Sequence, residues 1–68
     1  MRKQPEVTEL TRANLRRAFW DLYGSKPIEK ITIREVTDRA GYNRATFYLY
    51  FRDVYDVLEQ IEGEILGE

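Results

Sequence analysis

Apolar residues recur at three- and four-residue steps along most of the chain, which is the spacing of one buried helix face. The first such stretch predicts a helix from Glu6 to Tyr23 that ends at Gly24. Its buried stripe consists of Val7, Leu10, Leu15, Ala18, Phe19 and Leu22. Trp20 is expected to pack at the edge of the core. Three arginines lie away from the stripe, on a face that is either solvated or in contact with a phosphate: Arg12, Arg16 and Arg17.

A second periodic stretch runs from Thr32 to Ala40 and predicts a short helix with a buried face made of Ile33, Val36 and Ala40. The hydroxyl of Thr32 can cap this helix by accepting a hydrogen bond from an unpaired backbone N–H. Glu35, three residues later, completes a capping box. The sequence therefore specifies where this helix begins.

The next residues predict a tight turn and another helix. Gly41 follows the last periodic residue, where helices commonly end in a left-handed conformation that glycine adopts at little cost. Asn43 can cap the following helix at once. In that helix Phe47 and Phe51 are expected to point into the core. Residues 32–51 thus have the signature of a helix-turn-helix motif.

The motif is flanked by a connector and a last helix. In the connector, Ser25 to Ile31, we expect Ile28 and Ile31 to fill the core while Lys26 and Lys30 face water.

Asp53 can cap the last helix, Val54 to about Leu66, whose apolar stripe is Val54, Val57, Leu58, Ile61 and Ile65. Three preceding helices are expected to be too short to cover Ile61, Ile65 and Leu66. Either the chain is the head of a longer protein or this helix pairs with another copy. The complete pattern predicts an all-α, four-helix domain.

The amino-acid composition excludes several kinds of functional site. The 68 residues include no cysteine and no histidine, which excludes disulfides, Cys/His zinc sites and imidazole catalysis. We therefore expect no metal and no cofactor. The sequence has no run of 18 apolar residues, and its basic start leads to Pro5 and Glu6 rather than to an apolar signal region. A soluble, cytoplasmic protein without a membrane partner is expected.

The net charge of -1 conceals a segregated distribution. Residues 1–50 hold ten Lys/Arg and six Asp/Glu, whereas residues 51–68 hold one arginine and six acidic residues. The basic excess accompanies the predicted motif, and the acidic excess lies in the last helix. Such a field can direct one face of the domain toward phosphates.

The exposed face of the second motif helix carries the candidates for reading DNA. With two phenylalanines inside, the opposite side presents Arg44, Ala45, Tyr48 and Leu49. A major groove is wide enough for a helix, and the fork of Arg44 matches the two acceptors of a guanine edge. Ala45 and the ring of Tyr48 suit a thymine methyl group.

Other residues suit the DNA backbone. Hydroxyls that can donate to phosphates belong to Thr46, Tyr48 and Tyr50. Arg34 can reach either a base or the backbone, and the N–H groups near Thr32 and Asn43 are natural phosphate sites. Two alternatives stay open, because Tyr50 could simply pack and the caps explain Thr32 and Asn43 without DNA.

The run ITIREVTDRAGYNRATFYLYFRD resembles the DNA-binding head of the TetR (tetracycline repressor) family of bacterial transcription regulators. The resemblance covers essentially the whole chain and is strongest in Thr46-Phe47-Tyr48-x-Tyr50-Phe51. It implies that the second motif helix lies in the major groove. The residues implied near bases are Arg34, Arg44, Ala45 and Tyr48. Those implied near phosphates are Thr32, Asn43, Thr46, Leu49 and Tyr50.

The chain also departs from that family. The lysine that usually opens the fourth helix and contacts phosphate is Val54 here, and Arg52 can replace it only in part. Family members carry a C-terminal helical domain that binds an inducer and forms a homodimer, and this chain ends at Glu68, before that domain. The resemblance implies an isolated head, as a monomer, that contacts one operator half-site.

We therefore predict a DNA-binding domain spanning residues 1–68, with its helix-turn-helix at 32–51, that binds double-stranded DNA as the head of a TetR-like regulator, in the mode of a repressor. The alternative is a small helical protein-interaction module that uses the apolar stripe of the last helix. An enzyme is the least favoured class, because 68 residues leave little volume for a pocket.

Overall fold

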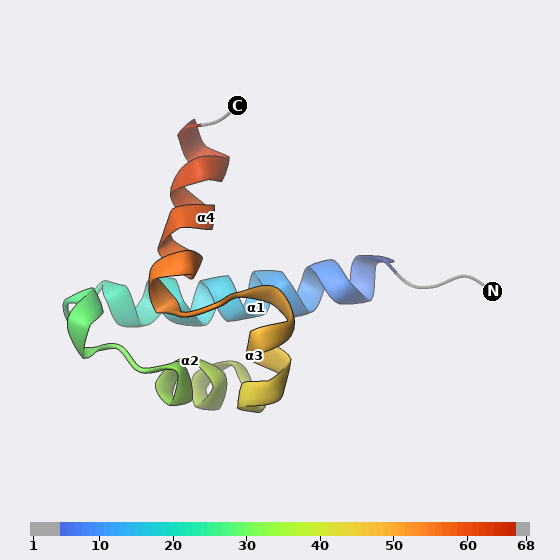
Figure 1. The fold of residues 1–68 in the computed structure, drawn as a ribbon, viewed down its shortest axis with the longest axis horizontal. Coiled ribbons are helices and arrows are strands. Elements are labelled where there is room, and N and C mark those ends of the chain that lie inside the picture. Colours follow the sequence, from blue (N-terminus) through green and yellow to red (C-terminus); the bar gives the residue numbers. More distant parts are fainter. Residues whose placement is uncertain (1–4, 67–68) are drawn as a thin grey trace.

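The computed structural model describes residues 5–66, with side chains described for residues 9–64. Over this range the chain forms four α-helices and one turn of 3-10 helix and contains no strand, which confirms the predicted all-α class. In chain order the elements are α1 (Pro5–Tyr23), η1 (Ile28–Lys30), α2 (Ile33–Ala40), α3 (Arg44–Tyr50) and α4 (Val54–Leu66) (Figure 1).

The long helix α1 is the element against which the others pack. Figure 1 shows α2 and α3 along one side of α1, while α4 leads away from the other side. The core between them consists of Leu15, Ala18, Phe19, Ile31, Val36, Phe47, Phe51, Val54 and Val57. Every helix contributes to this one cluster, so the helix-turn-helix is held by α1 from behind and by the start of α4.

Local capping fixes the ends of α2 as the sequence predicted. The hydroxyl of Thr32 accepts a hydrogen bond from the N–H of Glu35, and the Glu35 carboxylate accepts one from the N–H of Thr32, both at 3.1 Å. At the other end Gly41 has φ 87° and ψ 26°, the left-handed conformation. Its N–H donates to the carbonyl of Thr37 at 2.8 Å. These contacts confirm the capping box and the glycine turn.

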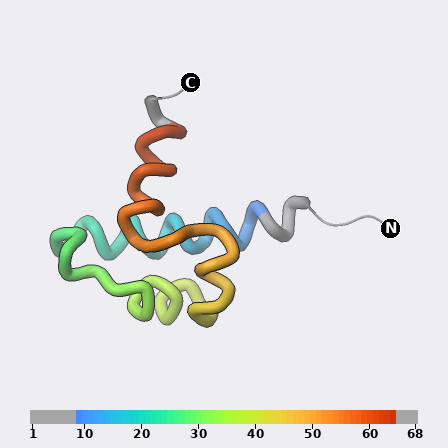
Figure 2. Tube along the Cα trace, viewed as in Figure 1, coloured from blue at the N-terminus to red at the C-terminus, as the bar shows by residue number. Residues whose placement is uncertain are grey.

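The two remaining helices of the motif region are capped as predicted too. The side chain of Asn43 accepts a hydrogen bond from the N–H of Thr46 at 2.9 Å, and Asp53 accepts one from the N–H of Asp56 at 2.9 Å. The short link from α3 to α4 (Figure 2) is held in place at both ends, because Phe51 and Val54 are buried in the core. The beginning of α4 is therefore fixed relative to α3.

The predicted stripe of α1 extends too far toward the N-terminus. Leu10 was expected to be buried, but 59% of it is exposed. The first turns of α1 project beyond α3 (Figure 1), so nothing in the described body covers that position. Leu15, Ala18 and Phe19 are buried as predicted. Val7 lies outside the described side chains.

The prediction that Ile61 needs an external partner was wrong. Ile61 is partly buried and packs against the core cluster. It lies beside α1, where it lines a shallow groove together with Trp20, whose ring centroid is 5.7 Å from that of Tyr23. Trp20 is 49% exposed and packs beside Tyr23, whereas packing of its ring against the core cluster stays a prediction. The side chains of Ile65 and Leu66 lie outside the described set.

Candidate nucleic-acid interface

The helix α3 has one buried side and one exposed side. Phe47 is fully buried, and its ring centroid is 5.4 Å from that of Phe51. By contrast, Tyr48 is 56% exposed and Leu49 is 75% exposed. The Tyr48 ring meets the Phe47 ring edge-on with centroids 5.7 Å apart, so the core restrains the base of an exposed side chain. The division of α3 into two faces matches the prediction.

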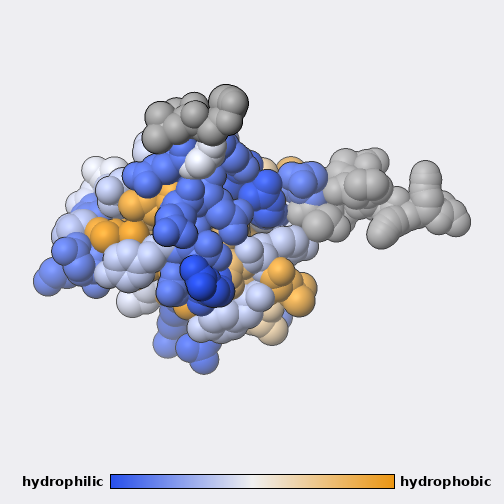
Figure 3. Space-filling model, turned by 45° about the horizontal axis from the view of Figure 1, so that its top comes forward, coloured by the Kyte–Doolittle hydropathy of each residue, from blue (hydrophilic) through white to orange (hydrophobic). Residues whose placement is uncertain are grey.

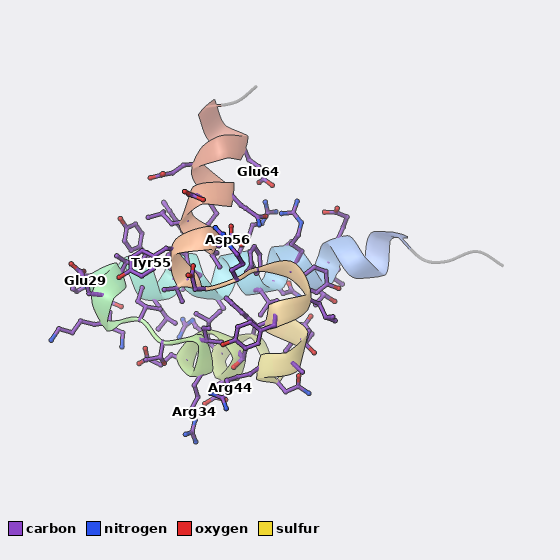
Figure 4. The ribbon with its side chains drawn as sticks, in the orientation of Figure 1. Glu29, Arg34, Arg44, Tyr55, Asp56 and Glu64 are labelled. Carbon is purple, nitrogen blue, oxygen red and sulfur yellow. The ribbon has the colours of Figure 1, made fainter. Side chains whose placement is uncertain are left out.

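Two arginines lie on the same edge of the molecule as this face. Figure 4 shows Arg34 and Arg44 at the edge formed by α2 and α3, far from Glu64 on α4. Arg34 lies 3.8 Å from Asp38, but both side chains are largely exposed, so this pair is weak. Arg44 has no ion-pair partner among the side chains of residues 9–64. Its guanidinium is available to an external acceptor.

The predicted backbone-binding residues fall into two groups. Thr32, Asn43 and Ala45 are exposed, and the first two already use a side-chain oxygen as a helix cap. Thr46 and Tyr50 are half-buried. The Tyr50 ring packs near Phe51 with centroids 6.5 Å apart, so the packing alternative is confirmed for the ring. Contact of its hydroxyl with phosphate stays a prediction.

The fourth helix begins differently from the family pattern described above. Val54 is only 6% exposed and belongs to the core. It replaces a polar contact with an apolar one. Arg52 is exposed, and its backbone N–H donates to the Asp56 carboxylate at 2.9 Å. Its side chain has no ion-pair partner among the described residues and lies next to α3 in the chain.

Two contacts near the motif were missed by sequence reasoning. Lys26, expected to face water, places its Nζ 2.5 Å from Oε2 of Glu35. Asn14 of α1 donates to the hydroxyl of Tyr42 in the turn before α3 at 3.0 Å. Both pairs join residues that are distant in sequence, and the first depends on the turn η1, so no local pattern indicated either of them.

The hydrogen bond from Lys26 and the backbone N–H of Thr32 hold the pKa of Glu35 below its ordinary value of 4.5. The carboxylate is therefore charged at neutral pH, and the ammonium beside it balances that charge at the start of α2.

Two of the three arginines of α1 make contacts that differ from both predictions, a solvated face and a phosphate contact. Arg12 donates to the side-chain oxygen of Gln60 at 2.9 Å and to Glu64 at 3.2 Å, and Arg16 pairs with the same carboxylate. Loss of hydration raises the pKa of Glu64, but the bonds and charges of Arg12 and Arg16 outweigh it and lower the pKa below 4.5. These two arginines hold α4 against α1. Arg17 is exposed and has no ion-pair partner among the described side chains.

The rest of the described surface offers little chemistry of another kind. Within residues 5–66 no helix is both long and apolar enough to cross a membrane. The same residues contain no cluster of three or more His, Cys, Asp or Glu side chains that could hold a metal ion. On the face seen in Figure 3, apolar atoms form small separate patches among hydrophilic ones.

Comparison with known proteins agrees with this geometry. The family described as "Bacterial regulatory proteins, tetR family" matches residues 15–61, which include the whole helix-turn-helix. A curated relative is the uncharacterized HTH-type transcriptional regulator YxbF of Bacillus subtilis (strain 168), which is 28% identical over 55 residues. The matched region covers 81% of this chain and 14% of that protein. No solved structure matches.

Proposed function

The chain belongs to the tetR family of bacterial regulatory proteins, and from this membership and the shape of α3 we propose that it binds double-stranded DNA sequence-specifically. The observation that supports the proposal most directly is the exposed face of α3. Arg44 is exposed without an ionic partner among the described side chains, and Tyr48 is held by a buried phenylalanine. A short helix anchored on one side and open on the other suits a major groove.

In the proposed complex α3 lies in the major groove. Arg44 donates to a guanine edge, and Ala45 and Tyr48 meet thymine methyl groups. Arg34 reaches a base or the backbone from α2. These contacts supply sequence discrimination, since a good bidentate arginine pair is worth about 1–3 kcal/mol.

The remaining predicted residues bind the DNA backbone. They fix the register of α3 without reading sequence and comprise Thr32, Asn43, Thr46, Leu49, Tyr50 and Arg52. Many family members have a phosphate-binding lysine at the position of Val54. Arg52 replaces part of that phosphate contact. Because Val54 is buried, the domain depends on its neighbours for phosphate contacts at the start of α4.

The whole protein is proposed to regulate transcription in the bacterial cytoplasm as a homodimer, with repression as its mode. The family resemblance supports each of these points. This chain spans only 14% of the length of the curated relative that it matches. A single head is expected to bind one half-site weakly, because a second, linked head would add a high effective concentration.

The test is a titration of the protein with random-sequence duplex DNA at two salt concentrations. The Arg44→Ala, Tyr48→Ala double variant should lose most of the binding. Tyr55→Ala is the matched control, because Tyr55 is 53% exposed, much as Tyr48 is, but lies on α4. It should bind like the wild type.

Affinity for DNA should fall steeply with salt, since released counterions drive phosphate binding. If the folded wild type does not bind duplex DNA at low salt, either alone or fused as a dimer, the proposal is wrong. The rival protein-interaction module is disfavoured because Val54 and Val57 are buried and Ile61 is partly covered. Salt-insensitive binding that survives the double substitution would favour it instead.

A further inference from the structure

The start of α2 combines a helix N-terminus with a carboxylate. Glu35 folds back so that Oε1 accepts from the N–H of Thr32 at 3.1 Å. The backbone N–H of Glu35 donates to the Thr32 hydroxyl. The backbone N–H groups of Ile33 and Arg34 have no acceptor among the described residues. Two donors therefore point out of this end of the helix beside a negative charge.

That arrangement creates an electrostatic conflict for DNA binding. Free N–H groups and the helix dipole attract a phosphate to the start of α2. The Glu35 carboxylate, one residue beyond Arg34, repels the same phosphate through its like charge. The capping box that fixes the start of α2 thus places a negative charge where a phosphate would bind.

Lys26, which lies outside α2, neutralises the charge of Glu35. Its Nζ lies 2.5 Å from Oε2, the carboxylate oxygen of Glu35 that is not engaged by Thr32. Side-chain exposure is 32% for Lys26 and 39% for Glu35, so the pair is partly shielded from solvent. The turn η1 returns the connector to α2 and places Lys26 there. No other cation among the described side chains pairs with Glu35.

We propose that Lys26 is a positioning residue for DNA binding, which neutralises Glu35 so that a backbone phosphate can be received by the start of α2. The inference rests on the proposed function and deepens it. Lys26 need not touch DNA, because its role is to cancel the charge of the capping carboxylate.

The experiment compares the affinity for duplex DNA at low salt in four proteins: the wild type, Lys26→Met, Lys26→Met with Glu35→Gln, and Lys30→Met. Glutamine at position 35 keeps the capping box, since its side-chain oxygen also accepts from the Thr32 N–H. Lys30 is the matched control, because it is exposed in the same connector and has no ion-pair partner among the described residues.

Lys26→Met should weaken binding about fivefold, as expected for one uncompensated charge near a phosphate at the surface. Adding Glu35→Gln should restore the affinity to within about twofold of the wild type, and Lys30→Met should cost less than Lys26→Met. Rescue in a protein that still lacks the Lys26–Glu35 contact would show that the charge of Glu35, and not the contact itself, causes the loss, and the smaller effect of Lys30→Met would separate this from a change in net charge alone. Thermal unfolding monitors the fold of each protein.

Unchanged binding by Lys26→Met overturns the inference, as does a loss that Glu35→Gln fails to restore. Equal losses in Lys26→Met and Lys30→Met would mean that only net charge matters, which also overturns it. Arg44→Ala is measured in parallel. If Arg44→Ala weakens binding while Lys26→Met does not, this inference fails and the proposed function stands. If the folded wild type does not bind DNA, both fail.

Discussion

At the scale of single residues, the availability of Arg44 follows from its neighbours. Phe47 and Phe51 provide the packing of α3, and Asn43 provides its cap. Nothing in the described structure requires the Arg44 side chain for stability, since it is exposed and unpaired. Arg44 is therefore free to contact a ligand. A change in DNA affinity on substitution of Arg44 can be interpreted directly, because the free energy of unfolding should change little.

Arg44→Ala should cost about 1–3 kcal/mol of binding to the preferred DNA sequence and relax the preference for guanine at the contacted position, while the salt slope, which counts phosphate contacts, stays nearly unchanged. Arg44→Lys should keep the salt slope but lose much of the sequence preference, because an ammonium is a point charge without the planar fork of arginine. Fluorescence anisotropy with a selected and a scrambled duplex measures both effects. Equal behaviour of Arg44→Lys and wild type on the two duplexes would contradict a guanine-reading role.

At the scale of elements, the turn between α2 and α3 sets the angle at which α3 leaves the body. Gly41 is the residue with positive φ within the described chain, and its N–H closes the end of α2 on Thr37. A Cβ at Gly41 would meet no heavy atom within 4 Å. The requirement for glycine is therefore conformational rather than steric crowding by a neighbouring element.

Gly41→Ala should destabilise the domain by about 1 kcal/mol, the cost of holding a β-carbon in the left-handed region. Gly63→Ala is the matched control. A Cβ there also meets nothing within 4 Å, but Gly63 lies inside α4. Alanine should stabilise that helix by about 0.5–1 kcal/mol. Urea unfolding measures both, and a Gly41→Ala protein as stable as the wild type would show that the turn relaxes easily.

At the scale of the whole molecule, two charge clusters join elements that are distant in sequence. Lys26 and Glu35 join the connector to α2, and Arg12 and Arg16 join α1 to Glu64 on α4. Both carboxylates have a lowered pKa. A carboxyl group that binds its proton less tightly when folded stabilises the fold above its unfolded pKa and loses that contribution as the pH falls through the lower folded value.

Stability should therefore decline as the pH drops below about 4.5, the ordinary value for both groups. Glu35→Gln and Glu64→Gln should each flatten this decline, and the two effects should add because the clusters share no residue. Urea midpoints at pH 7, 4 and 3 would measure it. An acid response identical in wild type and both variants would mean that other carboxyl groups govern it.

Helix number, helix ends and the inward side of α3 could all be predicted from the sequence, because periodicity and capping act between residues at most four apart. The exposed face with Arg44, Ala45, Tyr48 and Leu49 followed directly from placing Phe47 and Phe51 inside. The corresponding DNA contacts remain predictions, and so does the boundary of the domain at 1–68.

The sequence by itself therefore determined the all-α motif and its candidate face. Only the tertiary structure decided that Leu10 lies beyond the core, that Ile61 is partly covered, and that Lys26, Arg12 and Arg16 are paired. The physical reason is separation along the chain. A helix cap or an apolar stripe depends on residues that are close in sequence. An ion pair between α1 and α4 forms only after the core has brought those helices together.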